Sequence, residues 1–314
     1  MGKGTMKLSI ITINYNNAEG LRRTLESVAA QTYTNIEHVI VDGASTDNSV
    51  DVIKEYVQRF KIGDLQESFR TDKKLENVIW LSEKDNGVYH AMNKGIRKAS
   101  GDYIQILNSG DMLAAPDVTE RMMEAMRQFE IVDWQESFRT DKKLENGGIP
   151  ILYGNMLKSY DGKKVVRDNC GSVNSTDSFM YFYRGTLNHD SAYIRRDLFD
   201  KYGLYNEEMK ICSDWEWYVK AIALGGEKAV YTNIDVTIFD MNGVSESGGK
   251  NAELIKKERR EYLEKILPVT VLRDYDAFSF PIGQYQRLKR HHLWGGVNFM
   301  ERVLFKLEKW GVIK

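Results

Sequence analysis

The first part of the chain alternates short apolar runs with segments in which apolar residues recur every three or four positions. Residues 8–13 form a continuous apolar and β-branched run, typical of a buried strand, and residues 19–31 carry apolar side chains at helical spacing. Further strands are predicted at 38–41, 78–81 and 103–107, and further helices at 50–57 and 88–99. Repeated β-α-β units predict a mostly parallel sheet with helices on both faces.

The second part of the chain has a mixed pattern. Strands are predicted at 151–153, 191–194 and 235–239, and helices at 196–202, 214–224 and 252–266. Pro268 and Pro281 are expected to break the remaining tail into helical segments. We therefore expect an α/β domain over residues 6–245 and a helical extension, basic and aromatic, over residues 246–314.

Composition and charge narrow the class of protein. The 44 Lys and Arg residues nearly balance 45 Asp and Glu residues, for a net charge of −1, which argues against a nucleic-acid partner. Two cysteines are too few for a disulfide framework or a four-cysteine zinc site. No apolar run approaches the roughly 18 to 20 residues of a membrane span, and no signal peptide is visible, so we expect a cytoplasmic enzyme.

Polar clusters follow the predicted strands, where ligands of parallel α/β sheets bind. Asn14 and Tyr15 end the first strand, and Asp42 with Ser45 ends the second. A carboxylate at that edge can accept a hydrogen bond from a base N–H or a ribose hydroxyl, although turn and helix-cap roles are the alternative. Asp85 follows the third strand.

The helix after the third strand places Tyr89 and Asn93 four residues apart, on one face. Lys94 comes next, where it either meets a diphosphate or is a solvated lysine. The fourth strand ends in Asn108-Ser109-Gly110-Asp111, and a strand-terminal aspartate suits a hard divalent cation.

A final cluster opens the helix predicted at 214–224. Ser213 and Glu216 have the spacing of a capping box, which puts Asp214 in the first turn. A helix N-terminus stabilises the negative form of a carboxylate, and a positioned, ionised carboxylate is suited to act as a general base.

Taken in their order along residues 7–245, these clusters resemble the inverting glycosyltransferases of family 2, especially members of bacterial polysaccharide assembly. The resemblance implies a GT-A fold, a nucleotide-diphospho-sugar donor (a UDP-sugar by family frequency) and a saccharide or lipid-linked saccharide acceptor. By the family pattern, the nucleotide-binding residues are Thr12, Asn14, Tyr15, Asp42, Ser45, Asp85, Asn93 and Lys94.

The resemblance also assigns the remaining site residues. Asp111 would hold Mn²⁺ or Mg²⁺, with a weaker contribution from Asn108, which stands where many members have a carboxylate. Asp214 matches the catalytic base, and His189 and Trp215 match positions on the acceptor side. The alternative is a non-catalytic sugar-nucleotide-binding scaffold of a polysaccharide assembly complex. A dinucleotide dehydrogenase is excluded because the Gly-x-Gly-x-x-Gly loop is absent after the first strand.

Two features are left over. The same twelve residues occur at 66–77 and 135–146, which we interpret as surface insertions. Residues 284–314 carry a net charge of +5 beside apolar and aromatic residues. A basic amphipathic helix there would contact the inner face of the cell membrane, or would pack on the catalytic domain or on a second subunit as a homodimer.

Overall fold

The computed structural model describes residues 5–62, 77–140, 148–160, 164–168, 176, 178–241, 251–290 and 294–309. The chain divides into two compact units, Met1–Arg259 and Arg260–Lys314. The first copy of the repeat lies outside the described residues except for Asn77, and the second copy is described to Thr140, at the end of a helix.

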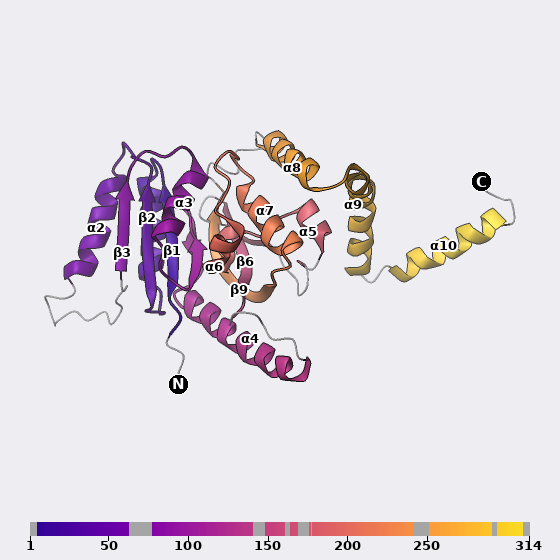
Figure 1. Cartoon of the computed structure of the whole chain (residues 1–314), viewed down its shortest axis with the longest axis horizontal. Coiled ribbons are helices and arrows are strands. Elements are labelled where there is room, and N and C mark those ends of the chain that lie inside the picture. The colour runs from indigo at the N-terminus through magenta and orange to yellow at the C-terminus, as the bar shows by residue number, and fades with distance from the viewer. Residues whose placement is uncertain are drawn as a thin grey trace. The chain divides into compact units, whose positions relative to one another are not determined.

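The first unit is built on one sheet, nine-stranded over the described residues, in the order β3-β2-β1-β4-β8-β6-β9-β5, with β7 beside β6 (Figure 1). Four strands at one side are parallel, as predicted: β1 (Leu8–Asn14), β2 (Ile36–Asp42), β3 (Asn77–Ser82) and β4 (Tyr103–Ile106). Their carboxyl ends therefore meet at one edge of the sheet. That edge brings together the polar clusters identified in the sequence.

The other strands make the sheet mixed. They are β5 (Met112–Leu113), β6 (Ile151–Tyr160), β7 (Lys164–Asp168), β8 (Ala192–Arg195) and β9 (Ala229–Asp240). β8 is antiparallel to β4 and to β6, whereas β9 runs parallel to β6 and antiparallel to β5. The strand at β6 is longer than predicted, and the predictions did not include β5 and β7.

Helices cover both faces of the parallel strands. α1 (Ala18–Ala29) and α4 (Val118–Thr140) share a buried cluster with Ile10 of β1. α3 (Val88–Lys98) lies on the opposite face, where a side chain on Gly95 would come within 2.3 Å of Ile11 Cγ2. Glycine is needed there because the helix backbone approaches the strand closely. α2 (Ser49–Ile62) packs against α1.

Short helices connect the later strands. They are α5 (Phe179–Arg184), a 3₁₀ turn (His189–Ser191), α6 (Asp197–Tyr202), α7 (Ser213–Tyr218) and a π-helical segment (Val219–Leu224) that follows α7 directly. α8 (Ala252–Ile266), α9 (Val269–Arg290) and α10 (Trp294–Lys309) complete the chain. The predicted break at Pro281 is wrong, because α9 continues through it. The predicted α/β class with a helical C-terminal extension is confirmed.

Candidate functional site

Asp42 links the ends of three parallel strands. Its Oδ1 accepts from Asn14 Nδ2 at 2.8 Å and from Ser45 Oγ at 2.5 Å, and its Oδ2 accepts from Ser82 Oγ at 2.6 Å and the Ser45 N–H at 3.0 Å. Burial raises the pKa of Asp42, but these hydrogen bonds outweigh it and lower the pKa overall. The carboxylate is fully buried and holds the strand ends together; its contact with the nucleotide stays a prediction.

Tyr15 and Asp85 both lie against Gly43 at this edge; the Asp85 side chain is 12% exposed. A methyl group on Gly43 would be 3.0 Å from Asp85 Oδ2 and 3.2 Å from Tyr15 Cδ2. Tyr15 is 68% exposed, so its ring is accessible to a ligand. A ring beside a carboxylate offers a stacking surface and a hydrogen-bond acceptor, the two groups that recognise a nucleobase and a ribose.

Lys94 holds Asp85 in position. Its ammonium group donates to Asp85 Oδ1 at 2.6 Å and the Lys84 carbonyl oxygen at 3.0 Å, and lies 2.9 Å from Glu83 Oε1. Burial lowers the pKa of Lys94, but the bonds to Asp85 and Glu83 outweigh it and raise the pKa. These three acceptors match the three donors of the ammonium group, so in this structure Lys94 orients Asp85.

Thr12 and Asn93 are buried and lie apart from this edge. The Thr12 hydroxyl is 2.9 Å from Nε2 of His38, in the core beside α2. Asn93 donates to the Tyr205 carbonyl oxygen and to Glu207 Oε1, both at 2.8 Å, and accepts from the Tyr205 N–H at 3.0 Å. Asn93 therefore fixes the loop before α7, and neither side chain is free to contact a nucleotide as predicted.

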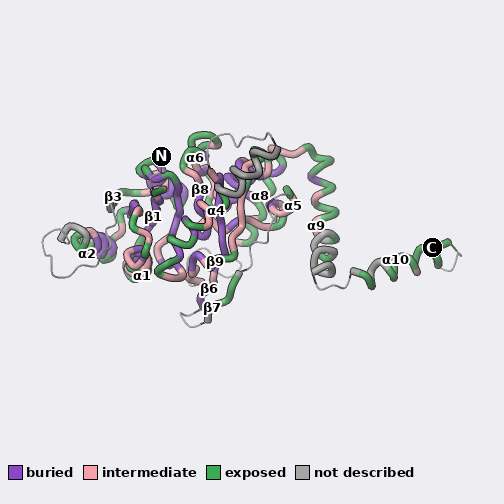
Figure 2. Tube along the Cα trace, turned by 90° about the horizontal axis from the view of Figure 1, so that it is seen from below, coloured by how far each residue is buried: buried purple, intermediate pink, exposed green. Residues whose placement is uncertain are grey.

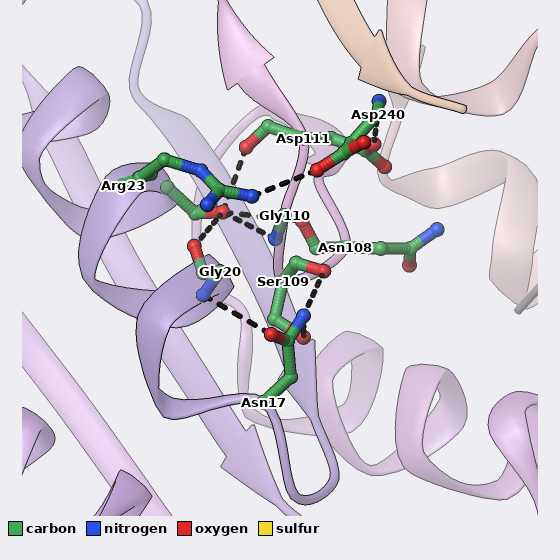
Figure 3. A network of polar contacts seen from close by, with 9 residues as sticks. Asn17, Gly20, Arg23, Asn108, Ser109, Gly110, Asp111 and Asp240 are labelled. Atoms are coloured by element: carbon green, nitrogen blue, oxygen red, sulfur yellow. Dashed lines mark hydrogen bonds and ion pairs between the residues drawn. The ribbon is translucent and has the colours of Figure 1, made fainter. Parts of the chain in front are cut away.

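The segment after β4 wraps around the first turns of α1 (Figure 3). The Thr24 hydroxyl donates to the Asp111 carbonyl oxygen at 2.7 Å and accepts from the Gly110 N–H at 2.9 Å. Asp111 Oδ1 accepts from the Asp240 N–H at 3.2 Å, and the Asp240 carboxylate pairs with Arg23 at 2.8 Å. Two carboxylates, from β9 and from the segment after β4, are thus held close together.

The surroundings of Asp111 disfavour the ionised form of its carboxyl group. Its pKa is raised well above the usual range, first by burial and then by the charge of Asp190. A bound cation would relieve this penalty. Among the described residues, no group of three His, Cys, Asp or Glu side chains is arranged to hold a metal ion. A cation at Asp111 would therefore need ligands from elsewhere.

Asp214 is held between a tyrosine and a histidine. Its Oδ1 accepts from the Tyr89 hydroxyl at 3.0 Å, and its Oδ2 lies 3.3 Å from Nδ1 of His189. Burial raises the pKa of Asp214, but His189, the Trp215 N–H and Tyr89 outweigh it and lower the pKa. The side chain remains 14% exposed, so the carboxylate is ionised and within reach of a ligand.

His189 carries the opposite charge. Burial lowers the pKa of His189, but its bond to Asp214 and the charges of nearby acids outweigh it and raise the pKa to about 9. Its Nε2 lies 3.2 Å from Nδ2 of Asn108. His189 therefore links the predicted base to the segment after β4, and this contact brings Asn108 and His189 together as one cluster.

The predicted capping box at α7 is wrong. Cys212 is the N-cap residue and has no side-chain capping bond. Ser213 Oγ instead accepts from the Asn206 N–H at 2.5 Å, and Glu216 pairs with Lys220 at 3.0 Å. Ser213 and Glu216 have the right spacing, but each finds a stronger partner outside the helix terminus.

The predicted acceptor contact of Trp215 is also not available in this structure. The indole is 1% exposed, and its N–H donates to the Phe182 carbonyl oxygen at 2.7 Å. The Arg259 guanidinium lies 5.1 Å from the centre of its ring. Trp215 is therefore part of the core beneath Asp214, whereas the His189 side chain is 20% exposed.

Two residues of the site were not predicted. Tyr89 was noted only for its helical spacing with Asn93, and Asp240 follows the strand predicted at 235–239 without being singled out. Both could have been found by asking which polar residues end a strand or line the helix face next to it. Neither signal says by itself which ligand the residue serves.

A mixed sheet with one parallel half, and with acidic side chains at the carboxyl ends of the parallel strands, fits the architecture of the GT-A glycosyltransferases. The chain matches the family described as Glycosyl transferase family 2 over residues 9–187, more than half of its length, and it belongs to this family. This confirms the resemblance inferred from the order of the motifs.

Curated relatives agree with this assignment. An uncharacterized glycosyltransferase of Mycobacterium tuberculosis is 30% identical over 219 residues, covering 68% of each chain. A PGL/p-HBAD biosynthesis glycosyltransferase of the same species is 24% identical over 250 residues, covering 80% of this chain and 81% of the relative.

Solved structures share the fold. Staphylococcus aureus TarS matches with a TM-score of 0.56 and 17% identity, over 88% of this chain but only 43% of TarS. TarS 1-349 in complex with UDP-GlcNAc matches at 0.55 and 19% identity, over 77% of this chain and 61% of that one. A Pyrobaculum calidifontis mannosyltransferase, in complex with GDP-Man and Mn²⁺, matches at 0.52 and 17% identity, over 87% and 70%.

Proposed function

We propose that this glycosyltransferase moves a sugar from a nucleotide-diphospho-sugar to an acceptor hydroxyl, with inversion at the anomeric carbon. The observation that carries the proposal is the Asp214 carboxylate, ionised, partly exposed and held by Tyr89 and His189. In this mechanism Asp214 takes the proton of the acceptor hydroxyl, whose oxygen attacks the anomeric carbon as the bond to the diphosphate breaks. One displacement from the opposite face inverts the configuration.

The donor's nucleotide part would bind at Tyr15 and Asp85. Complexes of structural neighbours with UDP-GlcNAc and with GDP-Man support this class of donor. A thermal-shift panel of nucleoside diphosphates and their sugars tests it, because binding to the folded state alone raises the melting temperature. We expect a uridine nucleotide to give the largest shift, by its frequency in the family.

Tyr15→Ala should weaken binding of the preferred nucleotide by about 1 to 3 kcal/mol, or roughly 5- to 150-fold, because it removes the stacking surface. Isothermal calorimetry measures the change. Tyr15→Phe keeps the ring and should bind like the native chain, and Tyr160→Ala removes another exposed tyrosine as a matched control. If Tyr15→Ala binds the nucleotide with native affinity, the nucleobase does not stack on Tyr15.

We also propose that transfer uses Mn²⁺ or Mg²⁺. The ligands of this chain would be Asp111 and Asp240, with diphosphate oxygens completing the coordination. Their all-oxygen chemistry fits a hard cation, and the side-chain amide of Asn108 lies in the same segment. When bound, the cation would offset the charge that develops on the leaving diphosphate. Arg23 forms an ion pair with Asp240 in this structure.

For the acceptor we propose a saccharide, free or lipid-linked, presented at a membrane surface that α10 contacts. Phe299, Met300, Leu304 and Phe305 are exposed on α10, which Figure 2 colours largely as exposed. The basic residues of the helix recur at helical spacing: Arg302, Lys306 and Lys309. In the described part of the chain, no helix has both the length and the apolar character that a membrane span requires.

Reversing the charge of Arg302, Lys306 and Lys309 to glutamate should release the chain from anionic vesicles. Each basic residue near anionic lipid contributes about 1 kcal/mol, so the partition coefficient should fall by more than about 10²-fold. Co-sedimentation with phosphatidylserine-containing liposomes at low salt measures it.

A control reverses three exposed lysines outside α10: Lys54, Lys98 and Lys256. It changes the net charge equally and should bind vesicles like the native chain. A native chain that does not bind, but sediments as a dimer through its C-terminal extension, would replace the membrane by a second subunit.

The competing proposal is a scaffold that binds the sugar nucleotide without transfer. Donor hydrolysis with and without Mn²⁺ separates the two, because only a catalytic site turns the donor over. The Asp214 environment favours the enzyme, since a scaffold has no need of an ionised carboxylate held at an accessible position.

A further inference from the structure

Glu258 of α8 is a buried acid on a largely exposed helix. Its side chain accepts hydrogen bonds from the backbone N–H groups of Lys210 at 2.7 Å, Ile211 at 3.1 Å and Cys212 at 3.0 Å. Glu258 is 9% exposed, whereas its neighbour Glu253 on the same helix is exposed. One carboxylate therefore satisfies three consecutive backbone donors that lie far from it in the sequence.

These three donors lead directly into α7, which carries Asp214. Backbone N–H groups at a helix start lack partners within the helix, and the N-cap residue Cys212 supplies no side-chain bond. Near this entry, Ser213 Oγ accepts from the Asn206 N–H and the Tyr89 hydroxyl donates to the Ile211 carbonyl oxygen. Glu258 adds the partner of the three backbone N–H groups from a different helix.

The next residue of α8, Arg259, contacts Trp215, the residue that follows Asp214. The Arg259 guanidinium lies over the ring of Trp215, 5.1 Å from its centre. Two adjacent residues of α8 therefore contact the chain on either side of Asp214. Glu258 binds the backbone before it, and Arg259 packs on the Trp215 side chain after it. Since Asn93 fixes the earlier part of the same loop at Tyr205, the loop is held at both ends.

We propose that Glu258 is a positioning residue for Asp214: through three backbone hydrogen bonds it fixes the entry to α7, and so the place of the carboxylate relative to the two substrates. This rests on the proposed function of Asp214 as the base. A misplacement of about 1 Å at a reacting group can cost about 10²-fold in rate. Glu258 therefore acts on the candidate site from within α8, although it lies beyond residue 245.

Glu258→Ala should lower kcat for transfer by about 10- to 100-fold, because the base loses its alignment, and should leave KM for the donor unchanged. Glu253→Ala is the matched control on α8 and should keep native kinetics. Formate or acetate, small enough to occupy the space of the lost carboxylate, should restore part of kcat in Glu258→Ala. The same anions should not restore Asp214→Ala.

A native kcat in Glu258→Ala would overturn the proposal. So would a lowered kcat that formate and acetate do not restore and that is accompanied by a raised KM for the donor. If Glu258→Ala does not fold, Glu258→Gln decides, because it keeps the shape but replaces one acceptor oxygen with a donor. A lowered kcat at unchanged KM then supports positioning, and a native kcat overturns it.

Amide hydrogen exchange of residues 210–212 gives a readout that does not depend on activity. Exchange should accelerate in Glu258→Gln and not in Glu253→Gln. If the native chain transfers no sugar, the proposed function fails, while faster exchange still shows that Glu258 holds the loop. Unchanged exchange in an active Glu258→Gln variant overturns the positioning role alone.

Discussion

Asp214→Asn should lower the rate constant of sugar transfer by about 10²- to 10⁴-fold, the usual contribution of a general base. The change is nearly isosteric, and the amide oxygen can still accept from Tyr89, but it no longer takes a proton. It also removes the charge that raises the pKa of His189. Donor binding should stay near native, because the substitution keeps the size and shape of the side chain.

The measurement pairs single-turnover transfer with calorimetry of the nucleotide. Asp200→Asn, at an exposed position of α6, is the control and should leave both unchanged. If Asp214→Asn transfers sugar within a few-fold of the native rate, another group accepts the proton and the assignment of the base is wrong.

Removal of divalent cations with EDTA should abolish transfer, and Mn²⁺ should restore it. A metal at the leaving diphosphate supplies several kcal/mol, so we expect a loss of about 10²-fold or more. Asp111→Ala should show the same loss without recovery, because it removes a ligand. Asp117→Ala changes an exposed aspartate a few residues away and should respond to EDTA and Mn²⁺ like the native chain.

As the pH is lowered, the affinity for Mn²⁺ should begin to fall at a higher pH than it would at a site with a solvated aspartate. The pKa of Asp111 is raised in the metal-free chain, so protons compete with the cation at a pH where a solvated aspartate would already be ionised. Titration of the reactivation by Mn²⁺ at several pH values checks this. Full activity after EDTA treatment would show that transfer does not need the metal.

The fold of the parallel half was predictable because apolar runs and helical spacing both report burial. β1, β2, β3 and β4 appear at or within a few residues of their predicted places. β5 was missed because a two-residue strand leaves no period to detect. The break predicted at Pro281 is wrong because a proline usually ends a helix, whereas α9 continues through this one.

The site was only partly predictable, because a sequence gives the type of a side chain and not the atoms it meets. The strand-end rule correctly brought Asn14, Asp42 and Asp85 to one edge. It could not tell that Asp42 would be consumed by bonds to Ser45 and Ser82, or that Lys94 would turn toward Asp85. Long-range contacts such as that of Glu258 with residues 210–212 leave no periodic signal at all.

The hydrogen bonds of Asp42 order the ligand-binding edge of the sheet during folding, before a nucleotide binds. Since one carboxylate joins the ends of β1, β2 and β3, the turns that follow these strands are already restrained before any nucleotide arrives. Their loss of conformational freedom is therefore part of folding and not of binding. Mutations at this edge are therefore tolerated less well. The free energy of nucleotide binding is not reduced by the entropy cost of ordering these turns.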